Sequence, residues 1–336
     1  TVTAILNHVG YEITSLRIDE ETDGRHAQVS FTKEWQQDAL RRDFTMNALY
    51  MDLQGQVYDY FDGLLHLKQK KVAFVGDARA RLEEDRLRLL RYFRFVARFS
   101  DGKCEPDLLH ICADFVKEIP KLASERIWQE WRKILVGPHL ASIVRHMQDI
   151  SVFDYLYGIN NVTISLSDID RIEGDGFQES IVALAALHWS EDYEKIPKIA
   201  KSLRLSGKER TRLENMFKNR SDLLLSEVES DDFYASYLTL GQEAVLDVLA
   251  IEMRNNPDQM RMQKIEKIKA FATEIGDPVF TLLGRDLALV GVPPGPAMGQ
   301  LLSYAREAWI KSGFKLSKSD CLDEVQKVMD NPDYKG

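Results

Sequence analysis

The sequence has few of the residues that cross-link small secreted proteins or bind zinc. Only three of its 336 residues are cysteines, none lie in a CxxC pair, and the seven histidines show neither HxH nor HExxH spacing. A disulfide framework and a zinc site are therefore not expected, and the cysteines are interpreted as reduced thiols of an intracellular protein. No apolar run approaches the roughly 20 residues of a membrane helix, so no membrane partner is expected.

An excess of positive charge is also missing. The chain holds 53 acidic and 44 basic residues, which give a net charge of −9, so the protein as a whole does not attract phosphate. Any contact with nucleic acid would need a local basic surface. The length and the hydrophobic fraction of 44% favour two or more domains with real cores.

The hydrophobic pattern changes from strand-like to helix-like at about residue 67. Apolar and polar residues alternate over 11–19, 26–32 and 55–61, which predicts strands. Beyond this point, a helix is predicted over 124–135, with Ser124 as its N-cap and Gly137 and Pro138 ending it. Further helices are expected at 178–189, 194–204, 207–218, 241–254, 258–274 and 297–311. The predicted fold class is α+β, with a small β-sheet in a head that precedes an all-α remainder.

An arginine-rich helix is predicted over residues 80–102. Arg88, Arg91 and Arg94 follow one another at steps of three with no acid between them. Like charges at this spacing cost about 0.2–0.5 kcal/mol per pair, so the pattern favours binding of a polyanion. Guanidinium groups suit phosphate because they bind it through two parallel hydrogen bonds. A solvated helix face remains the alternative.

Asp85 and Arg88 form a second pattern, one helical turn apart. A carboxylate facing an amino group and a guanidinium facing a ring acceptor would accept cytosine and adenine. Uracil and guanine present the reversed pattern and would leave polar groups unpaired. The alternative is an ordinary i,i+3 salt bridge on a helix. A third motif, RRDFTMNALY at 41–50, places two arginines and an aspartate before an apolar run, which in isolation is typical of a solvated turn.

Taken together, these motifs resemble class II tRNA nucleotidyltransferases, the CCA-adding enzymes that are grouped with bacterial poly(A) polymerases. The resemblance covers nearly the whole chain and is greatest to the animal, mitochondrial-type members, although 150–275 contributes only a helical pattern. The stretches that carry it occur in the family's order and spacing: RRDFTMNA at 41–48, DYFDG at 59–63, EDRLR at 84–88 and SERIWQEW at 124–131.

The resemblance implies a site in which amino-acid side chains select the incoming nucleotide, CTP first and then ATP. Asp85 and Arg88 would act as the template, while the RRD motif would contact ribose and triphosphate. The nucleotide-binding residues that it implies are Arg41, Arg42, Asp43, Asp85, Arg88, Arg91 and Arg94. The residues to which it gives structural or hinge roles are Asn47, Asp59, Gly63, Glu84, Glu125 and Arg126.

Four parts of the chain are also implied by the resemblance. Residues 1–66 would be the remainder of a nucleotidyltransferase head, 67–150 a neck that carries the nucleotide-selecting helix, 151–255 a helical body and 256–336 a helical tail. Body and tail would grip tRNA by its backbone, so the implied partners are tRNA, CTP and ATP. The family acts where tRNAs mature, which implies the mitochondrion, the cytosol or the nucleus.

The family's metal site has no counterpart in this sequence. Catalysis there uses two Mg²⁺ ions held by a DxD motif on an early strand, after a glycine-rich loop. The DxD at Asp168 and Asp170 has no such loop and is interpreted as part of a helix N-terminal cap. In this comparison Thr1 follows the metal-binding strands. We therefore expect an N-terminally truncated enzyme with exposed sheet edges and little catalysis of its own.

Two other functions stay open on the sequence. One is a poly(A)-adding relative, which shares the head motifs, and the other is a non-catalytic RNA-binding fragment. Nucleotide choice separates them: a CCA-adding enzyme binds CTP and ATP, a poly(A) polymerase favours ATP, and a plain RNA-binding protein favours neither.

Overall fold

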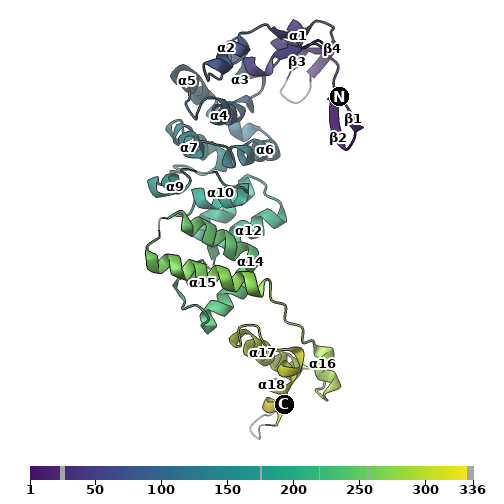
Figure 1. Cartoon of the computed structure of the whole chain (residues 1–336), viewed down its shortest axis with the longest axis vertical. Coiled ribbons are helices and arrows are strands. Elements are labelled where there is room, and N and C mark those ends of the chain that lie inside the picture. The colour runs from purple at the N-terminus through teal and green to yellow at the C-terminus, as the bar shows by residue number, and fades with distance from the viewer. Residues whose placement is uncertain (23–26, 175, 219, 256, 331–336) are drawn as a thin grey trace. The chain divides into compact units, whose positions relative to one another are not determined.

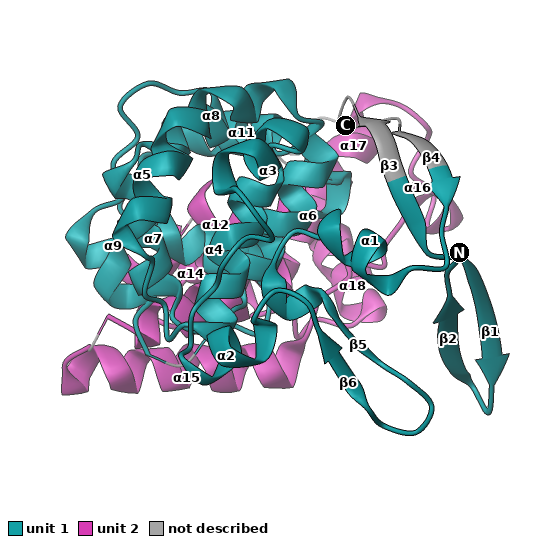
Figure 2. Ribbon diagram, turned by 90° about the horizontal axis from the view of Figure 1, so that it is seen from above, with its two compact units in different colours: residues 1–209 teal, residues 210–336 magenta. Residues whose placement is uncertain are grey.

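The structure, a computed structural model, describes residues 1–22, 27–174, 176–218, 220–255 and 257–330. The chain divides into two compact units, residues 1–209 and 210–336, which Figure 2 distinguishes by colour. Within the described ranges, no helix combines the length and the apolar character that crossing a bilayer requires. The four-part division stays a prediction.

The strands of the head form three separate two-stranded antiparallel sheets (Figure 1). They pair β1 (Val2–Leu6) with β2 (Val9–Ile13), β3 (Arg17–Thr22) with β4 (Ala27–Phe31), and β5 (Leu49–Met51) with β6 (Val57–Asp59). The α+β class with only small sheets is confirmed, and each of these strands pairs with its neighbour along the chain. The β1–β2 hairpin is exposed along its whole length.

Helices make up most of both units. Unit 1 contains α1 (Trp35–Leu40), α2 (Gly63–Lys68), α3 (Ala78–Glu84), α4 (Arg88–Phe99), α5 (Pro106–Phe115), α6 (Ser124–Leu135), α7 (Leu140–Asp149), α8 (Val152–Tyr157), α9 (Leu166–Arg171), α10 (Ser180–Leu187) and α11 (Ile196–Ser202). The boundary between the units falls in α12 (Gly207–Lys218). Unit 2 continues with α13 (Arg220–Leu225), α14 (Asp231–Met253), α15 (Gln259–Ile275), α16 (Gly284–Leu289), α17 (Pro296–Lys311) and α18 (Lys318–Met329).

The predicted helices of the second half of the chain are largely confirmed. α10, α11, α12, α15 and α17 each agree with an expected range to within two residues at either end. The helix expected at 241–254 is the second part of α14, where Gly241 adopts φ 77° and ψ 160° and interrupts the helical backbone. Only glycine reaches such a conformation without a steric penalty, so Gly241 allows the helix to be interrupted at this position.

The arginine-rich helix predicted over 80–102 is broken in two. α3 ends at Glu84, Asp85 is extended with φ −145° and ψ 105°, and α4 begins at Arg88. The Asp85 carboxylate accepts a hydrogen bond from the Leu87 amide at 3.1 Å. Such local bonds compete with the helix, which is why aspartate favours helix ends.

α4 has an apolar face and an arginine face, as its sequence predicts. Leu89, Phe93 and Val96 are buried, and the helix lies against α6 and α7. Trp131, which is fully buried, anchors α6. The burial of these side chains fixes the rotation of α4 about its axis and therefore the direction of its arginines. α6 begins at Ser124 with Ala123 in the N-cap position and no side-chain cap, so the prediction that Ser124 is the cap is wrong by one residue.

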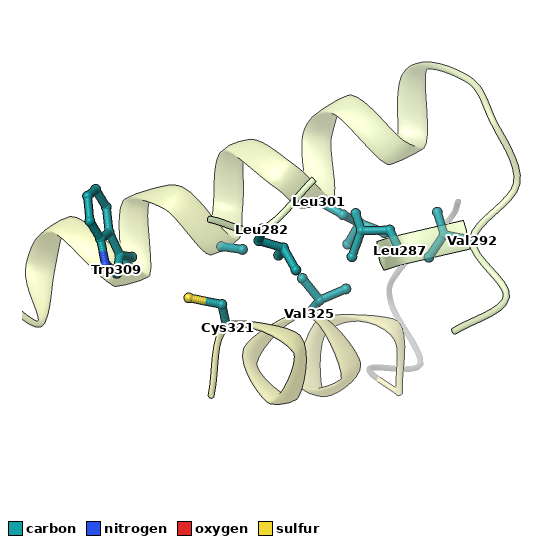
Figure 3. Close-up of a cluster of buried hydrophobic side chains, with 8 residues drawn as sticks. Leu282, Leu287, Val292, Leu301, Trp309, Cys321 and Val325 are labelled. Atoms are coloured by element: carbon teal, nitrogen blue, oxygen red, sulfur yellow. The ribbon is translucent and has the colours of Figure 1, made fainter. Parts of the chain in front are cut away.

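Unit 2 has a separate core around α17 and α18. Figure 3 shows Trp309 and Leu301 on one side, and Cys321 and Val325 on the other. Val292, from the Pro/Gly-rich turn before α17, closes the end of this cluster. The turn is thus held by burial of an apolar side chain as well as by its composition.

Gly63, at the start of α2, occupies a position with no room for a side chain. A Cβ atom built there would lie 2.5 Å from the carbonyl oxygen of Thr45. We predict that Gly63→Ala lowers the free energy of unfolding by about 1–3 kcal/mol, because backbone atoms must move apart. Gly207 begins α12, and a Cβ atom added there would have no other atom within 4 Å, so Gly207→Ala is the matched control. Equal urea-unfolding midpoints for the two variants would contradict the prediction.

Candidate nucleotide-binding site

An open pocket of about 520 Å³ lies in unit 1 where the end of α1, the α3–α4 junction and α4 meet. This volume is in the range that accommodates small-molecule ligands. Four arginines and two aspartates line it, a local excess of positive charge in an acidic protein. Its lining residues are Arg41, Arg42, Asp43, Asn47, Asp85, Arg88, Arg91 and Phe95.

The structure therefore brings together six of the seven residues that the resemblance implies for nucleotide binding. Arg94, the seventh, lines an adjacent pocket that shares Phe95 with the first. Of the residues given structural roles, only Asn47 is part of the lining.

Asp38 holds the first two arginines in place. Its side chain is fully buried, and its Oδ1 accepts hydrogen bonds from Arg41 Nε at 2.9 Å and Nη2 at 2.6 Å. Its Oδ2 accepts from Arg42 Nε at 3.1 Å and Nη2 at 2.8 Å, and from the Tyr50 hydroxyl at 2.5 Å. Both arginines follow Asp38 at helical spacing, so a single carboxylate can orient them both.

The Asp38 carboxylate is held in its charged form. Burial alone would raise the pKa of Asp38, but hydrogen bonds from Tyr50, the Arg17 amide and the two guanidinium groups bring it well below its ordinary value. Burial and donation to Asp38 raise the pKa of Tyr50 to about 12. The stabilisation that Asp38 contributes is complete above the pKa of an unfolded aspartate, about 3.9, and is lost only as the pH falls through the lower folded value.

Asp43 is the second buried carboxylate of the site. Its Oδ1 accepts from the Phe44 amide at 2.9 Å and from Asn47 Nδ2 at 2.9 Å. Its Oδ2 accepts from Arg91 Nε at 2.7 Å, and Arg91 Nη2 forms an ion pair with the same oxygen. Burial opposes ionisation, but the charge of Arg91 and these hydrogen bonds keep the pKa of Asp43 below its usual value. Three hydrogen bonds and one ion pair thus hold the Asp43 carboxylate.

The carboxylate of Asp85 has only some of its hydrogen-bond acceptor sites in use. Besides the Leu87 amide on Oδ1, it accepts a hydrogen bond on Oδ2 from Arg126 Nη2 at 2.9 Å. Two acceptor sites remain on its carboxylate. The Arg126 contact places this residue directly beside Asp85.

Arg88 is positioned by three contacts from two elements. Nη1 donates to Glu84 Oε2 at 2.6 Å and to the Arg81 carbonyl at 3.0 Å, and Nη2 donates to the Arg41 carbonyl at 3.1 Å. Three of the five N–H donors of its guanidinium are thus used. Among the described residues, Asp85 and Arg88 form no ion pair with each other, so the i,i+3 salt bridge considered from the sequence is wrong.

Glu130, from α6, supplies the counter-charge for the rest of α4. It is buried, and Arg94 Nη1 lies 3.1 Å from its Oε2, while Arg91 Nη1 lies 3.9 Å from its Oε1. Burial lowers the pKa of Arg94 and the charge of Glu130 opposes that shift. The absence of acids between the arginines in the sequence is therefore balanced by an acid from another helix.

The remaining structural residues lie outside the lining of the pocket. Asp59 ties down the start of α2, where its Oδ1 accepts from the Gly63 amide and its Oδ2 from the Leu64 amide, both at 2.9 Å. Glu125 forms an exposed ion pair with Arg204 at 2.7 Å, an arrangement that contributes little stability.

The DxD pair in the helical part of unit 1 is used structurally. Asp168 is buried, accepts hydrogen bonds from the amide and hydroxyl of Ser190, and forms an ion pair with Arg171. Ser165, three residues earlier, caps α9, so Asp168 and Asp170 lie in the helix and not at its cap. A side-chain cap is present in this region, as expected, but Ser165 provides it and the two aspartates do not.

Four residues belong to the site but were not identified from the sequence, namely Asp38, Tyr50, Glu130 and Phe95. Asp38 had a usable signal, since an acid three and four residues before two arginines on a helix predicts an ion pair. Tyr50 and Glu130 had none, because only the tertiary fold brings them to the arginines.

Comparison with known proteins places these features in a family. Residues 1–73 match the family described as the Poly A polymerase head domain, and residues 103–158 match the probable RNA and SrmB-binding site of polymerase A. The mitochondrial CCA tRNA nucleotidyltransferase 1 of Homo sapiens is 36% identical over 335 residues, which cover 98% of this chain and 75% of the human protein. The chain belongs to the CCA tRNA nucleotidyltransferase family.

Solved structures of CCA-adding enzymes have the same fold. The Bacillus stearothermophilus enzyme in complex with CTP gives a TM-score of 0.74 at 21% identity, over 97% of this chain and 80% of that one. The Thermotoga maritima enzyme complexed with tRNA gives 0.58 at 18% identity, over 88% and 74%. At these identities the likeness supports the fold of the CCA tRNA nucleotidyltransferases.

Nucleotidyltransferases of this family generally use a divalent metal ion. In the part of the chain that the structure describes, no group of three or more His, Cys, Asp or Glu side chains is arranged to hold one. Asp168 and Asp170 do not form such a group either. No set of metal ligands can therefore be named among the described residues.

We predict that Asp38→Asn lowers the free energy of unfolding by about 3 kcal/mol. The substitution replaces an acceptor oxygen with an amide donor and leaves two guanidinium groups without a buried counter-charge. Glu34→Gln, at the exposed N-cap of the same helix, makes the same charge change and should have little effect. Chemical unfolding of both variants tests this, and an Asp38→Asn protein as stable as the wild type would contradict it.

Proposed function

We propose that the protein adds C, C and A to the 3′ end of tRNA, taking CTP and ATP in turn and selecting them with its own side chains. The observation that carries this proposal is the partial occupancy of Asp85 and Arg88 in the pocket. Two carboxylate acceptor sites of Asp85 and two guanidinium donors of Arg88 are left for a ligand, whereas the buried Asp43 already accepts three hydrogen bonds.

The unused groups of Asp85 and Arg88 match the hydrogen-bonding edge of cytosine and of adenine. Cytosine and adenine each present an amino donor beside a ring-nitrogen acceptor, which Asp85 and Arg88 can meet together. Uracil and guanine would place a carbonyl against the carboxylate and an N–H against the guanidinium. The cost of leaving such groups unpaired in a pocket is the physical basis of the choice.

Ribose and triphosphate contacts are assigned to the RRD motif and to Arg91. Because Arg91 contacts Oδ2 of Asp43 through a hydrogen bond and an ion pair, a ribose hydroxyl that binds this oxygen would compete with Arg91. The freed Arg91 guanidinium would then be available for a phosphate. Arg41 and Arg42 remain fixed by Asp38 and offer a preformed positive edge, which Arg94 extends.

The residues of this chain thus bind, orient and discriminate. Magnesium is the divalent ion that we propose for the reaction, since Mg²⁺ suits triphosphate oxygens, and its ligands are not among the described residues. Asp59 and Gly63 are assigned to the connection of head and neck, and Glu125 to bracing of the neck.

Transfer RNA is the proposed partner of both units. The matched RNA-binding region at 103–158 and the tRNA complex of the Thermotoga relative support this assignment. A body over 151–255 and a tail over 256–336 would hold the RNA backbone. The mitochondrial name of the human relative supports a mitochondrial location, with cytosol or nucleus as the alternatives.

The proposed reaction can be tested by incubating this 336-residue chain with labelled CTP and ATP, Mg²⁺ and a tRNA that lacks its 3′-CCA. Ordered addition of C, C and A supports the proposal. Addition of A alone would favour a poly(A) polymerase, and RNA binding with no nucleotide binding would favour a plain RNA-binding protein. Each of these two outcomes would overturn it.

We predict that Asp85→Ala reduces discrimination against UTP and GTP by about 5- to 150-fold while RNA affinity changes little. The expected size follows from the free energy that one correctly hydrogen-bonded base edge contributes to discrimination. Glu83→Ala, on the exposed face of α3 two residues before Asp85, is the matched control. Competition binding with the four nucleotides measures the effect, and unchanged discrimination in Asp85→Ala would exclude the template role.

A further inference from the structure

A second pocket, of about 290 Å³, adjoins the nucleotide-binding pocket and shares Phe95 with it. It lies between the C-terminal parts of α4 and α6, and we call it the aromatic pocket. The residues that matter for its chemistry are Arg94, Phe95, Arg98, Phe99 and Lys133. None of the roles assigned above uses Arg98, Phe99 or Lys133.

Two aromatic rings form one wall of this pocket. Phe95 and Phe99 are nearly parallel, with ring centroids 5.7 Å apart and an interplanar angle of 20°. Phe95 is held from behind by Phe44, with centroids 4.9 Å apart, and by the Arg94 guanidinium at 4.8 Å. Phe99 is 36% exposed, so the outer member of the stack is partly accessible to solvent. A fixed ring with an exposed face is a ready platform for another flat ring.

The surroundings of the platform are positively charged. Arg94, Arg98 and Lys133 line the pocket, and Glu130 neutralises only one of these three charges. Arg98 is exposed and has no ion-pair partner within the described residues. Basic residues in the last turn of a helix also offset its dipole, but that role needs no exposed aromatic stack beside them.

We propose that the aromatic pocket binds the unpaired 3′-terminal nucleotide of the RNA acceptor strand, with its base on Phe99 and its backbone phosphate near Arg98 and Lys133. Stacking on aromatic rings within a basic groove is how proteins hold single-stranded nucleic acid. The shared Phe95 places this RNA end next to the incoming nucleotide, as nucleotidyl transfer requires. The inference rests on the proposed function and adds to it the subsite for the second substrate.

The test compares two fluorescent RNA hairpins that share one acceptor-stem sequence, one with a blunt end and one with an unpaired 3′ overhang. Phe99→Leu keeps the apolar bulk but removes the ring face, and it should weaken binding of the overhang RNA by about 5- to 100-fold. Binding of the blunt hairpin and of CTP should be unchanged. Phe99→Trp, which restores a ring face, should bind the overhang RNA within about twofold of the wild type.

Controls separate the subsite from the fold and from the function. Phe31→Leu changes an exposed phenylalanine outside both pockets and should have no effect on either RNA. Equal losses for the two hairpins in Phe99→Leu, or no loss, would overturn the subsite. A wild-type protein that adds nucleotides but binds both hairpins equally would overturn the subsite alone, whereas one that binds neither RNA nor nucleotide would overturn the proposed function with it.

Discussion

The structure depends on the pairing of clustered guanidinium groups with carboxylates, some one helical turn away along the chain and some from distant segments. Arginines that share one pocket repel one another, and removing the carboxylate partner from one buried pair costs about 3–5 kcal/mol. Each arginine that we propose to bind the nucleotide is therefore held by an acid. The pairs are Arg41 and Arg42 with Asp38, Arg88 with Glu84, Arg91 with Asp43, and Arg94 with Glu130.

This pairing gives the site two kinds of residue. Arg41 and Arg42 are fixed by one fully buried carboxylate that no ligand can reach, so they form a permanent positive edge. The Asp43–Arg91 pair faces the pocket, and a nucleotide that offers both a hydroxyl and phosphates can replace both halves of it. Ligand binding of this kind exchanges one ion pair for others and avoids exposing an unpaired charge.

The helix patterns in the sequence predicted which residues form the site. They did not predict most of the contacts between those residues. The apolar and basic faces of α4 could be read directly, because the burial of Leu89 and Phe93 follows helical periodicity. The break at Asp85 could not, since the same residues also satisfy one continuous helix, and a local side-chain bond to Leu87 decides between them. That break separates Asp85 from the helix of Arg88 and leaves each with unused hydrogen-bonding groups.

Contacts between distant segments account for most of what the sequence did not predict. Arg126 and Glu130 lie about forty residues from their partners Asp85 and Arg94, and no local pattern connects them. The strand patterns of the head did not predict which strands pair, and in the structure each strand pairs with its neighbour along the chain.

Calorimetric titration of the wild-type chain with each of the four ribonucleoside triphosphates tests the central claim most directly. The account predicts that CTP and ATP bind, and that UTP and GTP bind about 5- to 150-fold more weakly, since their base edges oppose Asp85 and Arg88. Four equal affinities would contradict it, because the arginines alone would then hold the triphosphate without any reading of the base.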